Sequence, residues 1–184
     1  MSGAFVAVVG ASGSGKDSVI RSARALLADQ ADNLVFPRRL ITRPVGAGED
    51  HMPMSEADFA RVEDGGGFAL SWRAHGLAYG LPATVVDAVQ KGDVVVANIS
   101  RAVLERLPER FERTAVVRVS VPEEQRRARL AGRGREADAE IAARMNREDP
   151  APNCRVDLEI VNDGAIDDAG RVFADFLRGL SRDQ

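Results

Sequence analysis

Short apolar segments alternate with amphipathic segments of helical period along most of the chain. Apolar runs typical of buried strands occupy residues 4–9, 34–41, 93–98, 114–121 and 156–161. Apolar residues recur with the spacing of one helix face in residues 16–27, 83–90, 101–107, 123–130 and 166–177, and Pro82 and Pro122 fit the first helical position of two of these segments. This alternation predicts an α/β fold, in which a mostly parallel, five-stranded sheet carries helices on both faces.

Two segments interrupt the alternation. Residues 37–82 contain glycine-rich turns, extended pieces at 68–72 and 77–81, and a helix start at Ser55 with an acidic first turn. The second segment, 126–147, is rich in arginine: Arg126, Arg127, Arg129, Arg133, Arg135, Arg144 and Arg147. Such a run is usual on a solvated helix, but its place after the fourth predicted strand also fits a lid that closes over a transferring phosphoryl group.

The composition is that of an ordinary globular protein. Of 184 residues, 45% are hydrophobic and 29% charged, which predicts a single domain with a real core. A net charge of −3 argues against a general nucleic-acid binder, and no apolar run is long enough to span a bilayer. Cys154 is the single cysteine, so an internal disulfide is excluded, and no secretory signal pattern opens the chain. We therefore expect a cytoplasmic protein.

The segment 10–18, GASGSGKDS, carries the strongest indication of chemistry. It follows the first apolar strand and opens the first helix, the setting in which a glycine-rich loop binds phosphate through successive backbone N–H groups. Lys16 is one of two lysines in a chain that otherwise uses arginine as its cation, and it would reach the β- and γ-phosphates. The sequence predicts a nucleotide-phosphate site formed by Gly10, Ala11, Ser12, Gly13, Ser14, Gly15, Lys16, Asp17 and Ser18, with Lys16 catalytic.

Asp17 stands where loops of this kind normally have a serine or threonine that binds Mg²⁺. A carboxylate is also a hard oxygen ligand suited to Mg²⁺, so Asp17 is a candidate metal ligand. An acidic residue in the first helical turn also complements the helix dipole without any metal. The sequence leaves both interpretations open.

Polar residues follow the third predicted strand. Asn98, Ser100 and Arg101 end the apolar run VVVA at the carboxyl edge of the sheet, where open α/β folds bind ligands. His75, beside Gly76, is a candidate contact to an acceptor phosphate or a ribose, and a solvated loop histidine is the alternative. Trp72 fits a core position or a pocket wall better than a stacking platform.

The order of these motifs resembles the guanylate kinase family of P-loop kinases over nearly the whole chain. The resemblance rests on GASGSGK (10–16), ITRPVGAGE (41–49), SEADF (55–59), GLAYG (76–80), RLAGRG (129–134), EIAARM (140–145) and IVND (160–163). It implies a P-loop kinase fold with an acceptor-binding region at about 37–82 and a lid at about 126–147. It further implies that Arg43 and Tyr79, with Arg39 of the same basic stretch, hold an acceptor phosphate. Arg133 and Arg144 would contact the transferring phosphates as catalytic residues, and Asn162 would line the adenine site.

The residues that read guanine in that family are absent from this chain. Leu70 and Leu81 occupy the positions of a base-reading glutamate and a hydroxyl residue, and Gly46 replaces a second phosphate-binding arginine. His51 replaces a tyrosine of the acceptor site, where we expect it to contact substrate, and Asn98 takes the place of an acidic residue. A site that loses its polar base readers loses most of its discrimination for the base. The chain therefore keeps the phosphate-handling residues without the base-reading ones.

The combination GSGKDS, RLITRP and HGLAYGLP resembles more closely the ribose 1,5-bisphosphate phosphokinases of phosphonate catabolism, a family similar to guanylate kinases. This resemblance implies phosphorylation of ribose 1,5-bisphosphate to 5-phosphoribosyl 1-diphosphate, with ATP as donor and Mg²⁺ as cofactor. The alternatives are a nucleoside monophosphate kinase and, less favoured because the loop is intact, a non-catalytic guanylate-kinase-like interaction domain. The expected partner is a small sugar phosphate, not a nucleic acid or a membrane, and a homodimer stays open.

Overall fold

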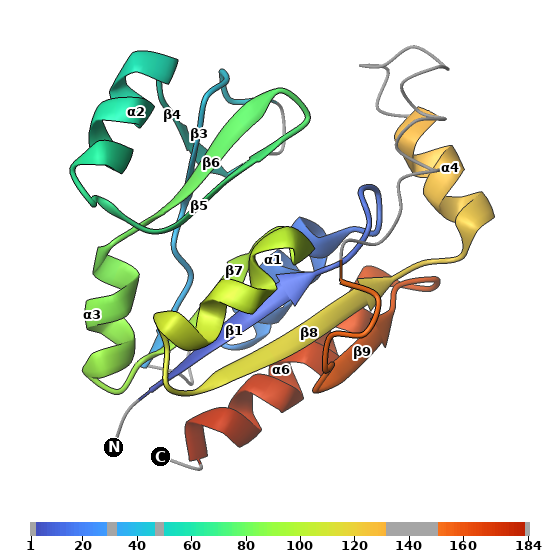
Figure 1. Cartoon of the computed structure of the whole chain (residues 1–184). Coiled ribbons are helices and arrows are strands. Elements are labelled where there is room, and N and C mark those ends of the chain that lie inside the picture. The colour runs from blue at the N-terminus through green and yellow to red at the C-terminus, as the bar shows by residue number, and fades with distance from the viewer. Residues whose placement is uncertain (1–2, 29–32, 47–49, 132–150, 183–184) are drawn as a thin grey trace.

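The computed structural model describes residues 3–28, 33–46, 50–131 and 151–182. Its centre is a parallel sheet of five strands in the order β2-β7-β1-β8-β9 (Figure 1). The strands are β1 (Ala4–Val9), β2 (Leu34–Val35), β7 (Val94–Asn98), β8 (Thr114–Ser120) and β9 (Leu158–Val161). The predicted α/β architecture is confirmed, and β1, which leads into the glycine-rich loop, is the central strand.

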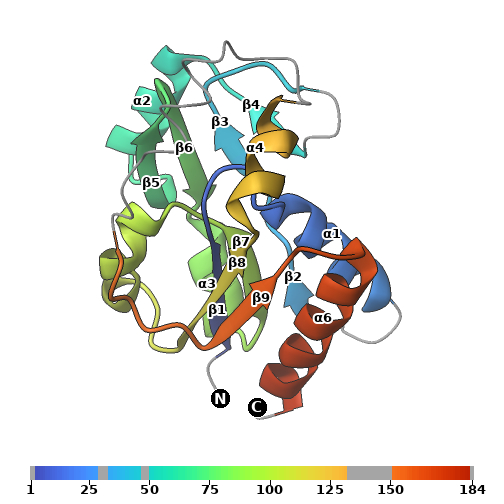
Figure 2. The same ribbon diagram turned by 90° about the vertical axis from the view of Figure 1, so that its right-hand side faces the viewer.

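Helices cover both faces of this sheet, as the alternation predicts. They are α1 (Lys16–Leu26), α3 (Thr84–Gln90), the 3₁₀ helix η1 (Arg101–Glu109) and α6 (Ile166–Arg182). Phe5 and Val9 of β1 pack in a core with α3 and η1, whereas Val6 and Val8 pack in a second core with α1 and α6. In Figure 2, α1 and α6 lie side by side on one face of the sheet. Because successive side chains of a strand point to opposite faces, one apolar strand contributes to both cores.

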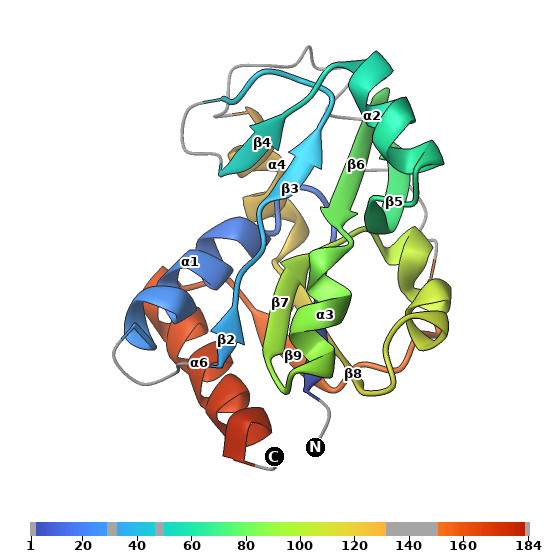
Figure 3. The ribbon, with the colours of Figure 1, turned by 90° about the vertical axis from the view of Figure 1, so that its left-hand side faces the viewer.

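The segment between β2 and α3 forms a second sheet of four strands in the order β4-β3-β6-β5. These strands are β3 (Arg39–Ile41), β4 (His51–Pro53), β5 (Phe68–Ala74) and β6 (Leu77–Pro82), and helix α2 (Glu56–Asp64) packs against them (Figure 3). Ser55 caps α2, since its hydroxyl accepts a hydrogen bond from the backbone N–H of Asp58 at 3.1 Å. The helix start predicted at Ser55 is therefore confirmed.

One predicted strand, residues 34–41, is divided between the two sheets. β2 ends at Val35 in the parallel sheet, and β3 begins at Arg39 in the second sheet. Pro37 lies between them and has no N–H to donate to a strand ladder, so the pairing stops there. The prediction of one continuous strand is wrong. The apolar pattern alone does not show that the chain changes sheets within residues 34–41.

The two prolines assigned to first helical positions lie earlier. Pro82 is the last residue of β6, where it pairs with Phe68, and α3 begins at Thr84. Pro122 directly precedes α4 (Glu123–Ala131), and its carbonyl accepts a hydrogen bond from the N–H of Arg126 at 3.0 Å. The helix expected over 101–107 is a 3₁₀ helix, η1, with Pro108 inside it. In an α-helix the ring of a proline clashes with the carbonyl four residues earlier, which fits the tighter helix.

The structure describes only the first residues of the predicted lid, 126–131, which belong to α4. Arg133 and Arg144 lie outside the described residues. Among the helices that the structure describes, none combines the length and the apolar character needed to cross a membrane.

Candidate active site

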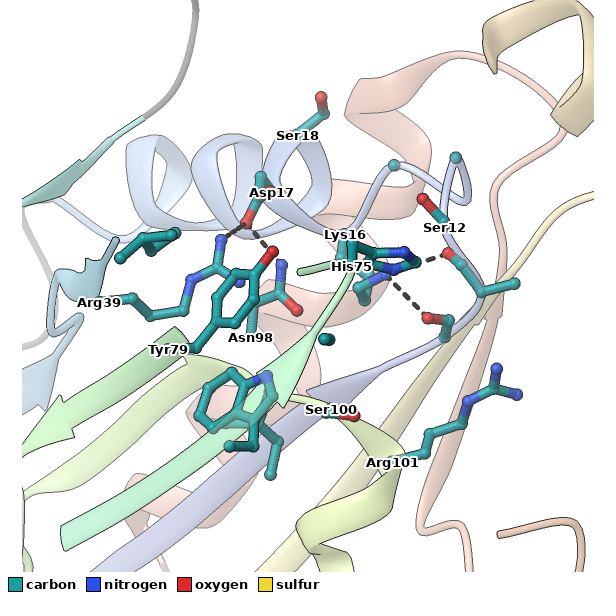
Figure 4. Close-up of a pocket in the computed structure, with 18 of the residues that line it drawn as sticks. Ser12, Lys16, Asp17, Ser18, Arg39, His75, Tyr79, Asn98, Ser100 and Arg101 are labelled. Atoms are coloured by element: carbon teal, nitrogen blue, oxygen red, sulfur yellow. Dashed lines mark hydrogen bonds and ion pairs between the residues drawn. The ribbon is translucent and has the colours of Figure 1, made fainter. Parts of the chain in front are cut away.

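A cavity of about 240 Å³ lies where the glycine-rich loop meets the end of β7 and the second sheet (Figure 4). Its lining residues come from these three regions and from α4: Gly10, Ala11, Ser12, Gly13, Gly15, Lys16, Asp17, Ser18, Arg39, Ile41, Arg43, Trp72, Ala74, His75, Tyr79, Asn98, Ile99, Ser100, Arg101 and Arg126. Most of the residues that the sequence nominates for phosphate and substrate binding therefore lie around one space. Three described candidates do not line it: Ser14, His51 and Asn162.

The loop from Gly10 to Gly15 has a backbone that only glycine adopts readily. Gly10 and Gly15 have φ angles of 151° and 91°, in the region that side chains disfavour. A Cβ atom on Gly10 would lie 2.2 Å from the carbonyl oxygen of Val119, and one on Gly15 would lie 2.4 Å from the Nδ2 of Asn162. Both glycines are required by conformation and by space, which explains their positions in the motif.

Lys16 folds back over this loop. Its Nζ donates hydrogen bonds to the carbonyl oxygens of Gly10 at 2.8 Å and of Ala11 at 3.0 Å. The ammonium group is thereby held at the mouth of the loop, at the start of α1, where the helix dipole adds positive potential. A phosphate bound by the loop would meet a cation already in place.

Asn162 holds the phosphate loop through a hydrogen bond to the backbone of Ser14. Ser14 is 1% exposed, and its Oγ has no hydrogen-bond partner among the described residues, so its side chain takes no part in the cavity. The Nδ2 of Asn162 donates to the carbonyl oxygen of Ser14 at 2.8 Å, and the N–H of Asn162 donates to the carbonyl of Ser120. The Asn162 side chain thus ties the segment after β9 to the phosphate loop.

Asn162 also lines a second cavity, of about 800 Å³, on the other side of the loop. Gly13, Gly15, Ser18 and Arg129 border the same space, and the guanidinium of Arg129 donates to the carbonyl oxygen of Asn162 at 2.9 Å. The two cavities share loop residues, so a nucleotide with its base in the second cavity would direct its phosphates toward the first.

The wall opposite the loop is a row of side chains across the second sheet. Ile41 of β3 is paired with Tyr79 of β6, and Tyr79 is paired with Trp72 of β5, so the three side chains share one face. The rings of Trp72 and Tyr79 are stacked, with centroids 5.4 Å apart and planes at 4°. Arg39 and Arg43 lie two positions on either side of Ile41, and both line the cavity. The wall is therefore an apolar surface flanked by cations.

The two histidines have different environments. His75 lines the cavity and adopts a positive φ of 54°, in the turn between β5 and β6. His51 is 2% exposed, and its Nε2 lies 3.3 Å from the carbonyl oxygen of Arg43. The expectation that His51 contacts substrate is not supported by this geometry. Because β4 pairs with β3, the imidazole is enclosed within the second sheet and contacts the backbone of Arg43 instead.

Asp17 makes the polar connection between the loop helix and the rest of the cavity. One oxygen, Oδ1, accepts a hydrogen bond from the Nδ2 of Asn98 at 2.7 Å and lies 3.3 Å from the NH2 group of Arg39 (Figure 4). Ser100 has a structural role as well, since its Oγ accepts from the N–H of Ala102 at 3.3 Å and caps η1. Asn98 and Ser100 thus contact neighbouring groups of the protein as well as the cavity.

Leu70 and Leu81 lie outside the cavity. They are paired across β5 and β6, both are 0% exposed, and they belong to the core that also holds Trp72. None of the described residues that line the cavity is a glutamate, so the base-reading glutamate has no replacement of its own kind there. The sequence analysis missed Ile41, Ala74 and Ile99 as lining residues; strand alternation from Arg39, Arg43 and Trp72 could have found the first two.

On the outer part of the second sheet, away from the cavity, hydrogen bonds and ion pairs lower the pKa of two carboxyl groups. A hydrogen bond from Arg73 lowers the pKa of the Glu63 carboxyl, and hydrogen bonds from Ser55 and Arg61 lower the pKa of Asp58. The Arg73 NH2 group lies 2.6 Å from Glu63 Oε2. One ion pair lies within α2 and the other joins α2 to β5, so both belong to the scaffold of the second sheet.

Comparison with solved structures identifies the class of protein. A crystal structure of guanylate kinase from Anaplasma phagocytophilum aligns with 97% of this chain and 86% of its own, with a TM-score of 0.69 and 20% sequence identity. At that identity the likeness shows the fold alone. Together with the glycine-rich loop and its lysine, it defines a P-loop kinase fold of the guanylate kinase type.

Comparison with curated proteins narrows this class to one family. The protein named ribose 1,5-bisphosphate phosphokinase PhnN of Pseudofrankia inefficax is 52% identical over 168 residues, which cover 91% of this chain and 87% of that protein. The protein of the same name from Methylobacterium radiotolerans is 47% identical over 97% of this chain and 99% of its own. No protein-family model matches the chain. The chain belongs to the ribose 1,5-bisphosphate phosphokinase family.

Proposed function

We propose that this protein transfers the γ-phosphoryl group of ATP to ribose 1,5-bisphosphate and releases ADP and 5-phosphoribosyl 1-diphosphate. The observation that carries the proposal is the composition of the cavity, together with the family to which the chain belongs. A phosphate loop forms one side, and the other side presents arginines around an apolar row without polar base readers. Such a cavity suits an acceptor that has phosphates and a sugar but no nucleobase.

The chemistry requires little from the protein beyond alignment and charge neutralisation. An oxygen of the acceptor's 1-phosphate attacks the γ-phosphorus of ATP, the bond from that phosphorus to the bridging β-oxygen breaks, and ADP leaves. The attacking oxygen is anionic at neutral pH, so no general base is needed. Rate enhancement then comes from holding two polyanions in line and from cations placed where negative charge develops.

Several cationic side chains have a proposed part in this transfer. Lys16 would leave the loop carbonyls of Gly10 and Ala11 and bind the β- and γ-phosphates of ATP. Arg43, two residues after Ile41, and Tyr79, paired with Ile41 across the second sheet, would hold a phosphate of the acceptor. Arg133 and Arg144 would approach from the lid segment, which lies outside the described residues.

Mg²⁺ fits the donors that the loop offers. The ion usually retains waters, takes one or two protein carboxylates and binds substrate phosphates, rather than a cage of protein ligands. Asp17 brings one carboxylate to the cavity beside Lys16, and among the described residues no group of three or more His, Cys, Asp or Glu side chains could hold a metal. Bound beside Asp17 with ATP, Mg²⁺ would neutralise charge on the transferring phosphates.

The apolar row of Ile41, Tyr79 and Trp72 would determine which acceptor the cavity selects. Trp72 is 8% exposed and stacked on Tyr79, and next to this stack along β5 and β6 the paired Leu70 and Leu81 fill the core. Where the resemblance to guanylate kinases places a base-reading glutamate and hydroxyl, this chain has Leu70 and Leu81, and polar groups of a purine left unpaired there would lower its affinity. A ribose ring can pack against the aromatic face while its two phosphates reach the flanking cations.

The test is to measure ADP release with ribose 1,5-bisphosphate and with GMP under identical Mg²⁺ and ATP, and to identify the product by phosphorus NMR. We expect kcat/KM for the sugar bisphosphate to exceed that for GMP by roughly a hundredfold or more, the scale set by absent polar readers. The Lys16→Met variant serves as the inactive control. Efficient phosphorylation of GMP without turnover of the sugar bisphosphate would refute the proposal and leave a nucleoside monophosphate kinase.

A further inference from the structure

Asp17 joins three parts of the fold through a single oxygen atom. It lies in the first turn of α1, directly after the loop lysine, and its Oδ1 accepts from Asn98 Nδ2 at 2.7 Å at the end of β7. The same oxygen lies 3.3 Å from NH2 of Arg39, the first residue of β3. Asn98 belongs to the parallel sheet and Arg39 to the second sheet. The carboxylate therefore connects the phosphate loop with the acceptor side of the cavity.

Stability does not explain this arrangement. The Asp17 side chain is 64% exposed and that of Arg39 is 19% exposed, so water and salt screen their attraction. Ion pairs with such exposure typically contribute less than about 1 kcal/mol to folding. Asn98, at 9% exposure, fixes the carboxylate by a shorter hydrogen bond and so sets its orientation. The arrangement is better explained by where it places the Arg39 guanidinium.

The charge of Asp17 is unfavourable for the proposed ligands unless it is paired. Its carboxylate borders the cavity that would receive two polyanions. Arg39 offsets this charge, and the pair uses one NH2 group of a guanidinium that carries five N–H donors in a planar fork. Arg39 begins β3, Arg43 lies in the bend that follows the strand, and both residues line the cavity together with Ile41. Arg39 can therefore contact an acceptor phosphate while it remains paired with Asp17.

We propose that Asp17 is a positioning residue for acceptor binding: held by Asn98, it orients Arg39 toward a phosphate of the acceptor, and Arg39 in turn neutralises it. The identity of that acceptor rests on the proposed function. In this proposal the aspartate after the loop lysine contributes to recognition of the acceptor, in addition to any contact with Mg²⁺. The proposal makes the two side chains interdependent, which a double-mutant cycle measures directly.

The experiment compares the wild type with Asp17→Asn, Arg39→Met and the double variant. KM and kcat for ribose 1,5-bisphosphate and for ATP are measured at saturating Mg²⁺, and binding of the sugar bisphosphate without ATP is measured by calorimetry. Arg39→Met should raise the acceptor KM by roughly thirtyfold, since it removes a charge-assisted phosphate contact and leaves Asp17 unpaired. Asp17→Asn should raise it roughly three- to fivefold. The double variant should bind the acceptor more tightly than Arg39→Met, while KM for ATP stays nearly constant in all variants.

Rescue of Arg39→Met by Asp17→Asn supports the proposal, and multiplied losses in the double variant overturn it. The neighbouring pair Arg38–Asp50 provides a matched control, because its atoms Nε and Oδ1 lie 2.7 Å apart and neither residue lines the cavity. Arg38→Met and Asp50→Asn should leave the acceptor KM unchanged, and an equal effect there would also overturn the proposal. If the wild type phosphorylates a nucleoside monophosphate instead, the proposed function fails, and the same cycle with that acceptor still decides between rescue and multiplied losses.

Discussion

Replacing Asn162 by alanine should loosen the phosphate loop in a measurable way. The side chain is 3% exposed, and its Nδ2 donates at 2.8 Å to the carbonyl oxygen of Ser14, a residue that is 1% exposed. Alanine leaves that carbonyl without its donor in a place that is sheltered from water. A buried polar group that loses its partner costs about 1–3 kcal/mol, which sets the expected loss in unfolding free energy.

For a chain of 184 residues this loss corresponds to a fall in Tm of about 2–12 °C. KM for ATP should rise because the loop is held less firmly, while KM for the sugar bisphosphate should change little. Chemical denaturation, thermal unfolding and steady-state kinetics measure these quantities. Asn162→Asp should be more damaging than alanine, since it sets a carboxylate oxygen against the Ser14 carbonyl.

Glu159→Ala is the matched control, because Glu159 is exposed on β9, the strand that directly precedes Asn162. It should leave the unfolding free energy and both KM values close to those of the wild type. If Asn162→Ala also leaves the unfolding free energy unchanged, the hydrogen bond to Ser14 does not hold the loop and the reasoning fails. An equal loss in the two variants would assign the effect to the strand rather than to the asparagine side chain.

Three further predictions concern the transfer itself. Lys16→Met should nearly abolish turnover, because it removes several kcal/mol of transition-state stabilisation, while circular dichroism should show an intact fold. Lys91→Met, which changes the chain's other lysine, should remain active. If Lys16→Met keeps near wild-type turnover, the assignment of the phosphate loop is wrong. Asp17→Asn should raise the Mg²⁺ concentration needed for half-maximal rate, and an unchanged titration would limit Asp17 to its partners Arg39 and Asn98. Arg133→Ala and Arg144→Ala should each lower kcat more than they weaken ATP binding, because their target is charge that develops during transfer; equal losses in both quantities would make them simple nucleotide contacts.

Much of the fold could be predicted from the sequence because its signals are local. The alternation of apolar runs and helical segments determines the parallel sheet and its covering helices, and the helix starts at Lys16 and Ile166 are confirmed. The division of residues 34–41 could not be predicted in this way. Which sheet a strand joins depends on partners distant in sequence, here Val94 for Leu34 and His51 for Arg39, and the apolar pattern carries no record of them.

The candidate site shows the same limit at the level of single side chains. Motif residues such as Lys16, Arg43 and Tyr79 reach one cavity because the loop and the strand ends converge there. The sequence gives residue type but not direction, so it could not show that His51 is enclosed or that Asn162 bonds to Ser14. The contact between Asp17 and Arg39 also depends on tertiary structure, since it joins helix α1 to strand β3 of the second sheet.

The division after Val35 has a consequence for how such a kinase can change its substrate. The chain leaves the parallel sheet at the end of β2, forms the entire second sheet, and returns to the first through α3, which begins at Thr84. The phosphate loop and the strands that support it come from the chain before and after this excursion. The second sheet is thus one continuous insertion, and its sequence can change without altering the strands that carry the phosphate loop.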